Sequence, residues 1–417
     1  MLRDHAVPPA LVSVAARPER RRGVELLRAD WHARELGRLA GHLAGAGAAA
    51  LRELGSERLL AAWTDVVDLF RDPASAERRA LDPPLAVLAR LSPAGLTAGL
   101  EAVLAGAAGE PARRLLAPAA PPEPGFALIV LASNLPGLAV QPLWRALARG
   151  RPALLKSASA EPLFAAAFAA ALARREPLLG DAVAAATWRG GDEDLEAPLL
   201  AAAREVVAYG EAATIADLAR RAPGRVVAHG PKTSLGLVTA EADRSAAAAG
   251  LARDVALFDQ RGCLSVQAVF TTGDAAALAG ELARALAGTA EAWPPGEPTL
   301  GESAAVQQLR AEAEMRGLLQ PPLPLAAGTV IVEPDAVFHL SPGLRTVRIH
   351  PIDDWRDLET ILGPWSGRLQ GAAIAGDLPS EVEALLRRQG VSRIAPAGEL
   401  QLAGVDWDDG AAAAALR

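Results

Sequence analysis

Short apolar runs alternate with segments of helical spacing from Phe126 to Gly230, and this alternation is the strongest constraint on the fold. Strands are expected at residues 126–133, 152–156, 182–188, 205–210 and 225–230, and helices at residues 141–148, 162–174, 195–203 and 214–220. Strands and helices that alternate in this way form βαβ units, in which the strands of the sheet are parallel. The sequence therefore predicts an α/β fold, whose ligands bind at the carboxyl ends of the strands.

The regions on either side of this segment have patterns of their own. From Val24 to Leu115 apolar residues recur at three- and four-residue spacing, which predicts a series of helices before a proline-rich stretch at residues 117–125. From Leu235 onward we expect a second α/β segment, with strands at residues 265–272, 328–333, 345–352 and 371–376, helices at residues 274–287 and from Trp355, and a proline-rich loop at residues 292–302. Because single cores rarely grow beyond about 250 to 300 residues, a chain of 417 residues is expected to form two domains.

Charge and hydrophobicity exclude several classes of partner. The net charge of −7 is spread along mixed acidic and basic segments, and no basic stripe is present that could neutralise a row of phosphates, so nucleic acid is not expected to bind. The longest apolar runs, such as Leu163–Ala173, are well short of the roughly 20 residues that a bilayer-spanning helix needs. The first residues lack the apolar stretch of a secretion signal. We therefore expect a cytoplasmic protein without a membrane span.

Cys263 is the single cysteine of the chain, which leaves two interpretations for it: a small buried hydrophobe or a reactive thiol. Gly262 precedes it and an expected strand follows it, an arrangement that leaves backbone N–H groups free near the sulfur to stabilise an oxyanion. A thiolate attacks thioester and aldehyde carbonyls readily. A single cysteine excludes an internal disulfide and a cysteine-cluster metal site, and no metal site is expected.

Three of the expected strands end in residues that suit a ligand: Ser133-Asn134, Lys156 and Gly210. A lysine at the carboxyl edge of a parallel sheet suits a ribose or a phosphate. Each position also has an ordinary explanation, because Ser-Asn-Leu-Pro-Gly is a common turn sequence and Lys156 could simply be a solvated strand end.

Four segments resemble the aldehyde dehydrogenase superfamily in sequence, order and spacing: ASNLPG (residues 132–137), LLKSAS (154–159), VVAYGEAAT (206–214) and FDQRGCLSVQ (258–267). Within that superfamily, QRGCLS (260–265), GVSRIAPAGEL (390–400) and WDDG (407–410) resemble the acyl-CoA reductases of the bacterial bioluminescence (LuxC) type. The resemblance extends from about Phe126 to Gly410. It implies a Rossmann-like cofactor-binding domain at residues 121–234, to which a helical N-terminal region at residues 1–120 also belongs. A catalytic domain at residues 235–395 and a C-terminal return segment at residues 396–417 would follow.

The resemblance also implies roles for individual residues. Cys263 would be the nucleophile, and Asn134 would direct its side-chain amide at the developing oxyanion. The nicotinamide cofactor would be held by Ser133, Lys156, Ser159, Gly210 and Glu211. Many NAD-using relatives have a glutamate at the position of Ser159, where a carboxylate would repel a 2′-phosphate, so we expect NADPH, although NADH also fits. At the position of Glu211 many relatives have a phosphate-binding serine, so this chain departs from them there. The resemblance to the superfamily also implies that the protein forms homo-oligomers.

The segment Arg225–Val238 departs most informatively from the superfamily. Oxidising aldehyde dehydrogenases place there a glutamate that activates water, whereas this chain has Ala228 and His229 and no acid. Without that base, hydrolysis of an acyl-enzyme is expected to be slow, so that the acyl group accepts hydride instead. The expected function is NADPH-dependent reduction of an acyl thioester, from acyl-CoA or an acyl-carrier protein, to an aldehyde through an acyl-cysteine.

Several alternatives stay open at this point. His229 is a candidate for proton transfer, but a lone histidine is more often structural. No chemistry is expected of the acidic tail motif at residues 407–410. The chain could also be an aldehyde-oxidising enzyme that uses another base, or a catalytically silent homologue that binds an acyl group or scaffolds a complex.

Overall fold

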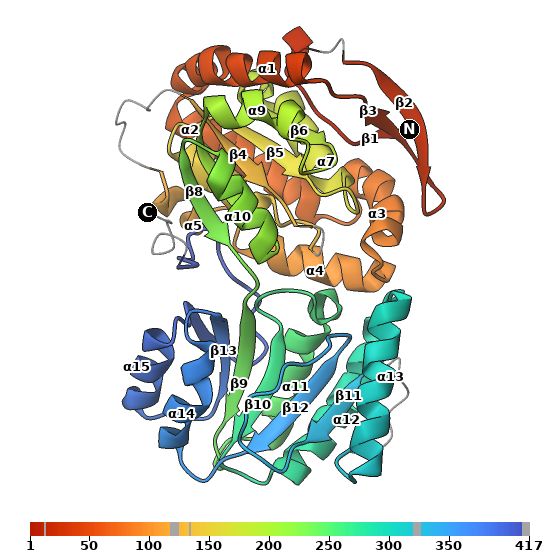
Figure 1. Cartoon of the computed structure of the whole chain (residues 1–417), viewed down its shortest axis with the longest axis vertical. Coiled ribbons are helices and arrows are strands. Elements are labelled where there is room, and N and C mark those ends of the chain that lie inside the picture. The colour runs from red at the N-terminus through yellow and green to blue at the C-terminus, as the bar shows by residue number, and fades with distance from the viewer. Residues whose placement is uncertain (12–13, 117–124, 133–134, 320–326, 411–417) are drawn as a thin grey trace.

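Two parallel sheets, each covered by helices, form two units that lie one above the other in the computed structural model (Figure 1). The structure describes residues 1–11, 14–116, 125–132, 135–319 and 327–410. The first unit contains the N-terminal region and a five-stranded sheet, and the second unit contains a six-stranded sheet. The predicted α/β architecture is confirmed.

The N-terminal region begins with a small sheet and continues as helices. Its strands are β1 (Leu2–Arg3), β2 (Ala16–Arg21) and β3 (Val24–Ala29), in the order β1-β3-β2. The helices that follow are α1 (Ala33–His42), the π-helical turn η2 (Leu43–Gly47), α2 (Ala48–Arg71), α3 (Ala76–Ala89), α4 (Pro93–Ala105) and α5 (Glu110–Arg114). A short 3-10 turn, η1 (Pro9–Leu11), lies between β1 and β2.

The helical prediction was wrong for residues Val24–Ala29. Arg21 pairs with Val24 in an antiparallel register, which leaves Arg22 and Gly23 as a two-residue turn. Both turn residues have positive φ, 49° and 83°, as a tight hairpin turn requires. The turn overrides the helix-like spacing of the apolar residues in this short segment.

The five-stranded sheet of the first unit has the order β6-β5-β4-β7-β8 and is entirely parallel. Its strands are β4 (Phe126–Val130), β5 (Ala153–Ser157), β6 (Val183–Thr187), β7 (Ala203–Tyr209) and β8 (Arg225–His229). The helices are α6 (Val140–Ala148), α7 (Leu163–Arg175), α8 (Pro177–Ala182), α9 (Glu193–Ala202) and α10 (Ala212–Arg221). Since β5 and β7 lie on opposite sides of β4, the winding direction reverses there, and such a switch point is where open α/β sheets bind ligands.

Packing on the two faces of this sheet explains why the N-terminal region belongs to the first unit. On one face, aromatic residues of α2, α6 and α7 pack together, with Trp63 4.8 Å from Trp144 and 5.3 Å from Phe168 between ring centroids. On the other face, buried side chains of α1 and α9, among them Leu36 and Leu199, pack against the strands. The N-terminal helices therefore cover a sheet that they precede in the chain.

The six-stranded sheet of the second unit has the order β11-β12-β10-β9-β13-β14 and is also parallel. Its strands are β9 (Thr233–Val238), β10 (Val266–Thr271), β11 (Thr329–Val332), β12 (Thr346–Pro351), β13 (Leu369–Ala375) and β14 (Arg393–Pro396). The helices are α11 (Arg244–Ala256), α12 (Ala275–Ala292), α13 (Leu300–Met315), α14 (Leu358–Leu362) and α15 (Ser380–Arg388), with 3-10 turns η3 (Leu257–Gln260), η4 (Trp355–Asp357) and η5 (Gly363–Trp365).

Helix α13 was not predicted, because its first residues lie in the expected proline-rich loop. The helix begins with a capping box. The Glu302 backbone N–H donates to the Thr299 hydroxyl, and the Thr299 backbone N–H donates to the Glu302 carboxylate. This local arrangement satisfies two N–H groups that a helix start would otherwise leave unpaired.

The chain passes between the two units twice within the described residues. It first runs from the end of β8 at His229 to the start of β9 at Thr233. After β14 it returns to the first unit, where the Val405 N–H donates to the Gly106 carbonyl (3.0 Å) and Arg114 Nη2 lies 2.6 Å from Asp406 Oδ2. The C-terminal segment is therefore anchored on helices that lie far earlier in the sequence.

No single helix among the described residues is long and apolar enough to cross a membrane. Helices α3 and α4 meet the length and composition criterion only as a pair, and they are bent by 105° relative to each other.

Candidate active site

A left-handed turn precedes Cys263 and sets the direction from which the chain reaches it. Phe258, Asp259 and Gln260 have φ angles of 53°, 51° and 65°, in a region that residues with a Cβ rarely adopt. Three such residues in succession cost free energy, and they persist only where surrounding contacts impose them.

The side chains of the turn supply those contacts. Asp259 accepts two hydrogen bonds from Arg345, from Nε (3.0 Å) and Nη2 (2.8 Å), in an ion pair that is almost fully buried. Gln260 donates to the Val266 carbonyl (2.7 Å) and accepts from the Thr346 N–H (2.8 Å). The turn is thus attached to both neighbouring strands, β10 and β12.

Phe258 connects the turn to the first unit. Its buried ring lies against Gly99 of α4, where an added Cβ would be only 2.5 Å from the ring. Gly262 also lies beside the first unit, because a Cβ there would be 3.7 Å from Leu135. Cys263 is therefore held where the two units meet.

The Cys263 side chain is exposed to solvent, although protein surrounds the thiol closely enough to disfavour its charge. Burial is the main cause that raises the pKa of Cys263 to about 11, and the negative charge of Asp409 raises it further. The backbone N–H groups of Cys263 and Leu264, with the charge of Lys232, act in the opposite direction. These two N–H groups near the sulfur are of the kind that could also stabilise an oxyanion.

The raised pKa predicts how the reactivity of Cys263 depends on pH. Iodoacetamide reacts with the thiolate, which is a small fraction of the thiol at neutral pH when the pKa is about 11. The alkylation rate is expected to increase about tenfold for each pH unit between pH 7 and pH 9. Intact-protein mass measures the rate directly, because Cys263 is the single cysteine. The urea-unfolded chain is the control, because an ordinary thiol pKa of about 8.5 makes its rate level off above about pH 9. A native rate that levels off in the same range would contradict the raised pKa.

Tyr209 and His229 lie side by side at the ends of β7 and β8. Their rings stack with centroids 4.1 Å apart and planes inclined by 10°, as their paired register places them. Burial lowers the pKa of His229, while the nearby Asp409 carboxylate opposes that shift. Burial and Asp409 raise the pKa of Tyr209, and the charge of Cys263 adds to the increase. At neutral pH both rings are therefore uncharged, and Tyr209 lies near enough to Cys263 to sense its charge.

Asp409 brings a carboxylate to this cluster from the C-terminal segment. Its Oδ2 lies 2.8 Å from Arg145 Nη1 and 3.7 Å from His229 Nδ1. We expected no chemistry of the motif at residues 407–410, yet its second aspartate faces the histidine at the end of β8. Tyr209, Arg145 and Asp409 were all missed by the sequence analysis. Tyr209 and Asp409 had a usable signal, since both lie in segments that resemble the family, whereas Arg145 had none.

A pocket of about 460 Å³ opens between α9 and α10, next to the carboxyl ends of β4 and β5. Its wall is largely apolar with a few charged groups, and it is lined by Leu128, Val130, Lys156, Trp188, Gly190, Gly191, Glu196, Leu199, Leu200, Ala213, Thr214, Asp217, Leu218 and Arg221. Small-molecule sites have this composition, with apolar walls and a few polar groups that fix orientation.

The polar atoms of this pocket suit a dinucleotide. Burial lowers the pKa of Lys156, whose Nζ lies 5.7 Å from the centre of the Trp188 ring. Glu196 accepts from Trp188 Nε1 (2.9 Å) and Arg221 Nη2 (2.6 Å). Arg221 Nη1 is buried and has no hydrogen-bond partner among the described residues, so it can donate to a ligand. An adenosine between the apolar walls and a ribose or phosphate near Lys156 and Arg221 therefore fit the groups present.

Of the other predicted cofactor residues, the structure describes Ser159, Gly210 and Glu211, and none of these three lines the pocket. Gly210 follows β7, and Glu211 caps the N-terminus of α10 without a side-chain hydrogen bond to the helix. The Ser159 carbonyl accepts a hydrogen bond from Arg21 of the β2–β3 hairpin. Ser133 and Asn134 lie outside the described residues. The described residues also include no group of three or more ligands that could hold a metal ion.

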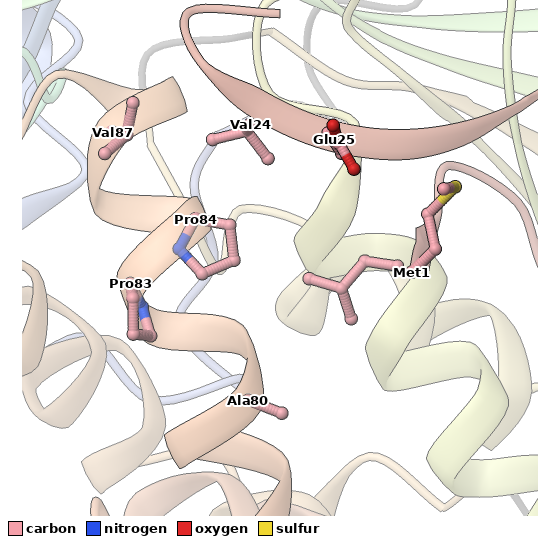
Figure 2. A pocket seen from close by; sticks show the side chains of 8 residues that line it. Met1, Val24, Glu25, Ala80, Pro83, Pro84 and Val87 are labelled. Carbon is pink, nitrogen blue, oxygen red and sulfur yellow. The ribbon is translucent and has the colours of Figure 1, made fainter. Parts of the chain in front are cut away.

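A second surface pocket, of about 590 Å³, lies between the first strands and α3 (Figure 2). Figure 2 shows Met1, Val24 and Glu25 across from Pro83 and Pro84. None of the candidate site residues lines it, so the chemistry discussed above belongs to the junction between the units.

Comparisons with known proteins agree on both the family and the fold. The model of the family "Acyl-CoA reductase (LuxC)" matches residues 119–416, more than half of the chain. The long-chain acyl-protein thioester reductase of Aliivibrio fischeri is 27% identical over 282 residues, covering 66% of this chain and 58% of the relative. Long-chain acyl-protein thioester reductase 2 of Photobacterium leiognathi is 27% identical over 237 residues, covering 55% of this chain and 49% of the relative. The chain thus spans about half the length of these curated relatives.

Solved structures of aldehyde dehydrogenases share the architecture. An oxidoreductase from Marinobacter aquaeolei has a TM-score of 0.69 at 15% identity, covering 92% of this chain and 87% of the other. Aldehyde dehydrogenase 21 from Physcomitrella patens, in complex with the product succinate, has a TM-score of 0.69 at 14% identity, with the same coverage of 92% and 87%. An indole-3-acetaldehyde dehydrogenase in complex with NAD+ has a TM-score of 0.65 at 16% identity, covering 89% of this chain and 82% of the other. The chain therefore belongs to the acyl-CoA reductase (LuxC) family and has the aldehyde dehydrogenase fold.

Proposed function

We propose that this protein reduces a thioester-linked acyl group to an aldehyde through an acyl-cysteine formed at Cys263. The observation that carries the proposal is the placement of Cys263: a solvent-exposed thiol at the end of a tightly held left-handed turn, with two backbone N–H groups near its sulfur. Membership of a reductase family supports this direction of the reaction. The activity reported in the names of the relatives, reduction of long-chain acyl-protein thioesters, points to the same class of substrate.

In the proposed reaction the Cys263 sulfur attacks the carbonyl carbon of the donor thioester. A new carbon–sulfur bond forms, the bond to the donor sulfur breaks, and the donor thiolate takes up the proton that Cys263 loses. The N–H groups of Cys263 and Leu264 stabilise the oxyanion, with Asn134 proposed as a further donor. His229, held uncharged by burial, is the proposed group that transfers the proton.

The pocket between α9 and α10 is the proposed site of the nicotinamide cofactor, whose reduced form supplies a hydride to the acyl carbon when bound. Lys156 and Arg221 would bind its ribose or phosphate groups, and Gly210 and Glu211 lie at the helix start that would face the pyrophosphate. We propose NADPH, because Ser159 offers no carboxylate that would repel a 2′-phosphate. Ser133 is proposed as a further cofactor-binding residue. Once the acyl carbon is reduced, the bond between that carbon and the Cys263 sulfur would break, the sulfur would take up a proton, and the aldehyde would be released.

The two sheets divide these tasks in the proposal. Residues 121–234, covered by the N-terminal region, would form the cofactor-binding domain, and residues 235–395 the catalytic domain that presents Cys263. The remaining segment, residues 396–417, would join them from the other side. CoA and an acyl-carrier protein are both suitable donors, because each presents the same thioester to Cys263.

Intact-protein mass spectrometry tests the proposal in two stages. The protein is first incubated with CoA thioesters of graded chain length, and in parallel with an acyl-carrier thioester, without nicotinamide. A mass increase of one acyl group on Cys263 is expected, and its rate ranks the donors. NADPH or NADH is then added, and loss of the acyl mass with formation of aldehyde is expected, faster with NADPH.

Other outcomes of the same experiment would contradict the proposal. Absence of any acyl adduct would support a silent acyl-binding or scaffolding homologue. Formation of acid from free aldehyde and NADP+ without a donor thiol would support aldehyde oxidation with a base other than the glutamate of the oxidising relatives.

A further inference from the structure

The C-terminal segment reaches the reaction centre only because it crosses back to the first unit. Gln141 Nε2 donates to the Trp407 carbonyl (3.3 Å), and Arg145 donates to the same carbonyl. Gln370 of β13 donates to the Asp409 carbonyl (3.2 Å). Residues from both units thus fix the backbone that carries Asp409.

The Asp409 side chain is buried in this position, with 7% of it exposed. A buried carboxylate needs a counter-charge, and Arg145 provides one at 2.8 Å. The same oxygen of Asp409, Oδ2, lies 3.7 Å from His229 Nδ1. This is longer than a hydrogen bond, but such contacts in ligand-free sites often shorten when substrate binds.

His229 is restrained on a second side by Tyr209. The stacked phenol ring fixes the plane of the imidazole, so that the ring can turn only within that plane. A carboxylate beside Nδ1 favours the tautomer in which Nδ1 carries the proton, and this leaves Nε2 as a proton acceptor.

We infer that Asp409 is a positioning residue, which holds the His229 imidazole in the orientation and tautomer that allow proton transfer to and from Cys263. The inference rests on the proposed function, because it assigns a role within the acylation of Cys263. It also gives a chemical reason for an aspartate in the tail motif at residues 407–410.

The proton balance of the acylation step is complete with these groups. As the Cys263 sulfur attacks the thioester carbon, its proton moves to His229 Nε2. The imidazolium is stabilised by Asp409 and returns that proton to the donor sulfur as the bond to the acyl carbon breaks. The products are the acyl-cysteine and the free donor thiol, and His229 is neutral again.

The groups that act electrostatically on His229 come from four parts of the chain. Asp409 of the C-terminal segment raises its pKa, whereas Arg145 of α6 and Lys232 of the β8–β9 connection lower it. Tyr209 of β7 contributes an uncharged ring. Asp409 also disfavours the Cys263 thiolate. Asp409 is therefore expected to have two opposite effects on acylation. It lowers the thiolate fraction of Cys263, and it improves the orientation of His229 as the base.

This opposition provides the test. In Asp409→Asn, the rate of Cys263 acylation by an acyl-CoA is expected to decrease by about 10- to 100-fold, because the base loses its orientation. Alkylation of Cys263 by iodoacetamide needs only the thiolate, and it is expected to be as fast as in the wild type or faster, because a negative charge has been removed. A merely structural loss would also slow acylation, but it would give the alkylation rate and pH profile of the urea-unfolded chain, because the burial that raises the pKa of Cys263 would be lost.

Asp406→Asn is the matched control on the same segment. It removes the ion pair with Arg114 (2.6 Å) that helps to anchor the segment, but not a group that faces His229. Both rates are expected to remain within about twofold of the wild type. His229→Phe keeps a ring on Tyr209, and it should lower acylation at least as much as Asp409→Asn. The double variant is expected to be no slower than His229→Phe alone, because Asp409 acts only through His229.

The outcomes separate the inference from the proposed function. If wild-type Cys263 is not acylated, the proposed function fails. If the wild type is acylated and Asp409→Asn is acylated at the same rate with the same pH profile, the positioning role is overturned. If Asp409→Asn does not fold, His229→Phe provides the test. Wild-type acylation kinetics in His229→Phe would overturn the inference, because Asp409 is proposed to act only by positioning His229.

Discussion

Replacement of Cys263 by alanine is expected to abolish acyl transfer and thioester-dependent oxidation of NADPH, with a decrease of at least about a thousandfold in rate. The thiol is the proposed attacking group, and the chain has no second cysteine that could replace it. Because the side chain is exposed, its loss leaves no cavity in the core, and the free energy of unfolding is expected to change by no more than about 0.5 kcal/mol.

Three measurements check this result: acylation by intact mass, oxidation of NADPH by absorbance, and binding of NADPH by fluorescence. Binding is expected to be unchanged, because the pocket between α9 and α10 does not include Cys263. Thioester-dependent oxidation of NADPH that survives in Cys263→Ala would remove the basis for an acyl-cysteine mechanism.

Replacement of Arg345 by methionine is expected to lower the free energy of unfolding by about 3 to 5 kcal/mol. Arg345 and Asp259 have side chains that are 1% and 4% exposed, so the variant would leave a buried carboxylate without its counter-charge. Asp259 also has a left-handed backbone that this ion pair helps to impose. Acylation of Cys263 is expected to slow as well, because the turn that precedes it would keep the Gln260 contact with Thr346 but lose the Asp259 contact with Arg345.

Urea and thermal unfolding measure the change in stability. Arg356→Met is the matched control, since Arg356 pairs with Asp354 at the surface and is 90% exposed, so that the midpoint of unfolding is expected to stay close to that of the wild type. The double variant Asp259→Asn/Arg345→Met removes both charges and is expected to recover part of the stability. Equal midpoints for Arg345→Met and Arg356→Met would show that the buried pair does not support the turn.

Sequence reasoning succeeded where structure is determined locally. Each strand from β4 to β8 is an apolar run bounded by turn residues, and all five were located from that pattern. The β3 strand was missed because its six residues also fit helical spacing, and only the Arg22-Gly23 turn distinguishes the two. Helix α13 was missed because prolines precede a capping box that is recognisable only once the helix is known.

The candidate site was only partly predictable, because some of its residues are placed by local motifs and others by contacts between distant parts of the chain. Cys263, Lys156 and His229 each follow from a local motif or from a position at a strand end. Asp409 does not, because its contact with Arg145 joins residues that are 264 positions apart in the chain. A contact of that range depends on how the C-terminal segment folds back over the first unit, and no local pattern encodes it.

The two passages of the chain between the units restrict how those units can move. A body attached at one point can turn in any direction, whereas a body attached at two points can rotate only about the line that joins them. Here one attachment begins at His229 and the other ends close to Asp409. Both residues therefore lie near the axis of any opening motion. A rotation about that line would change the distance between this histidine and this carboxylate little.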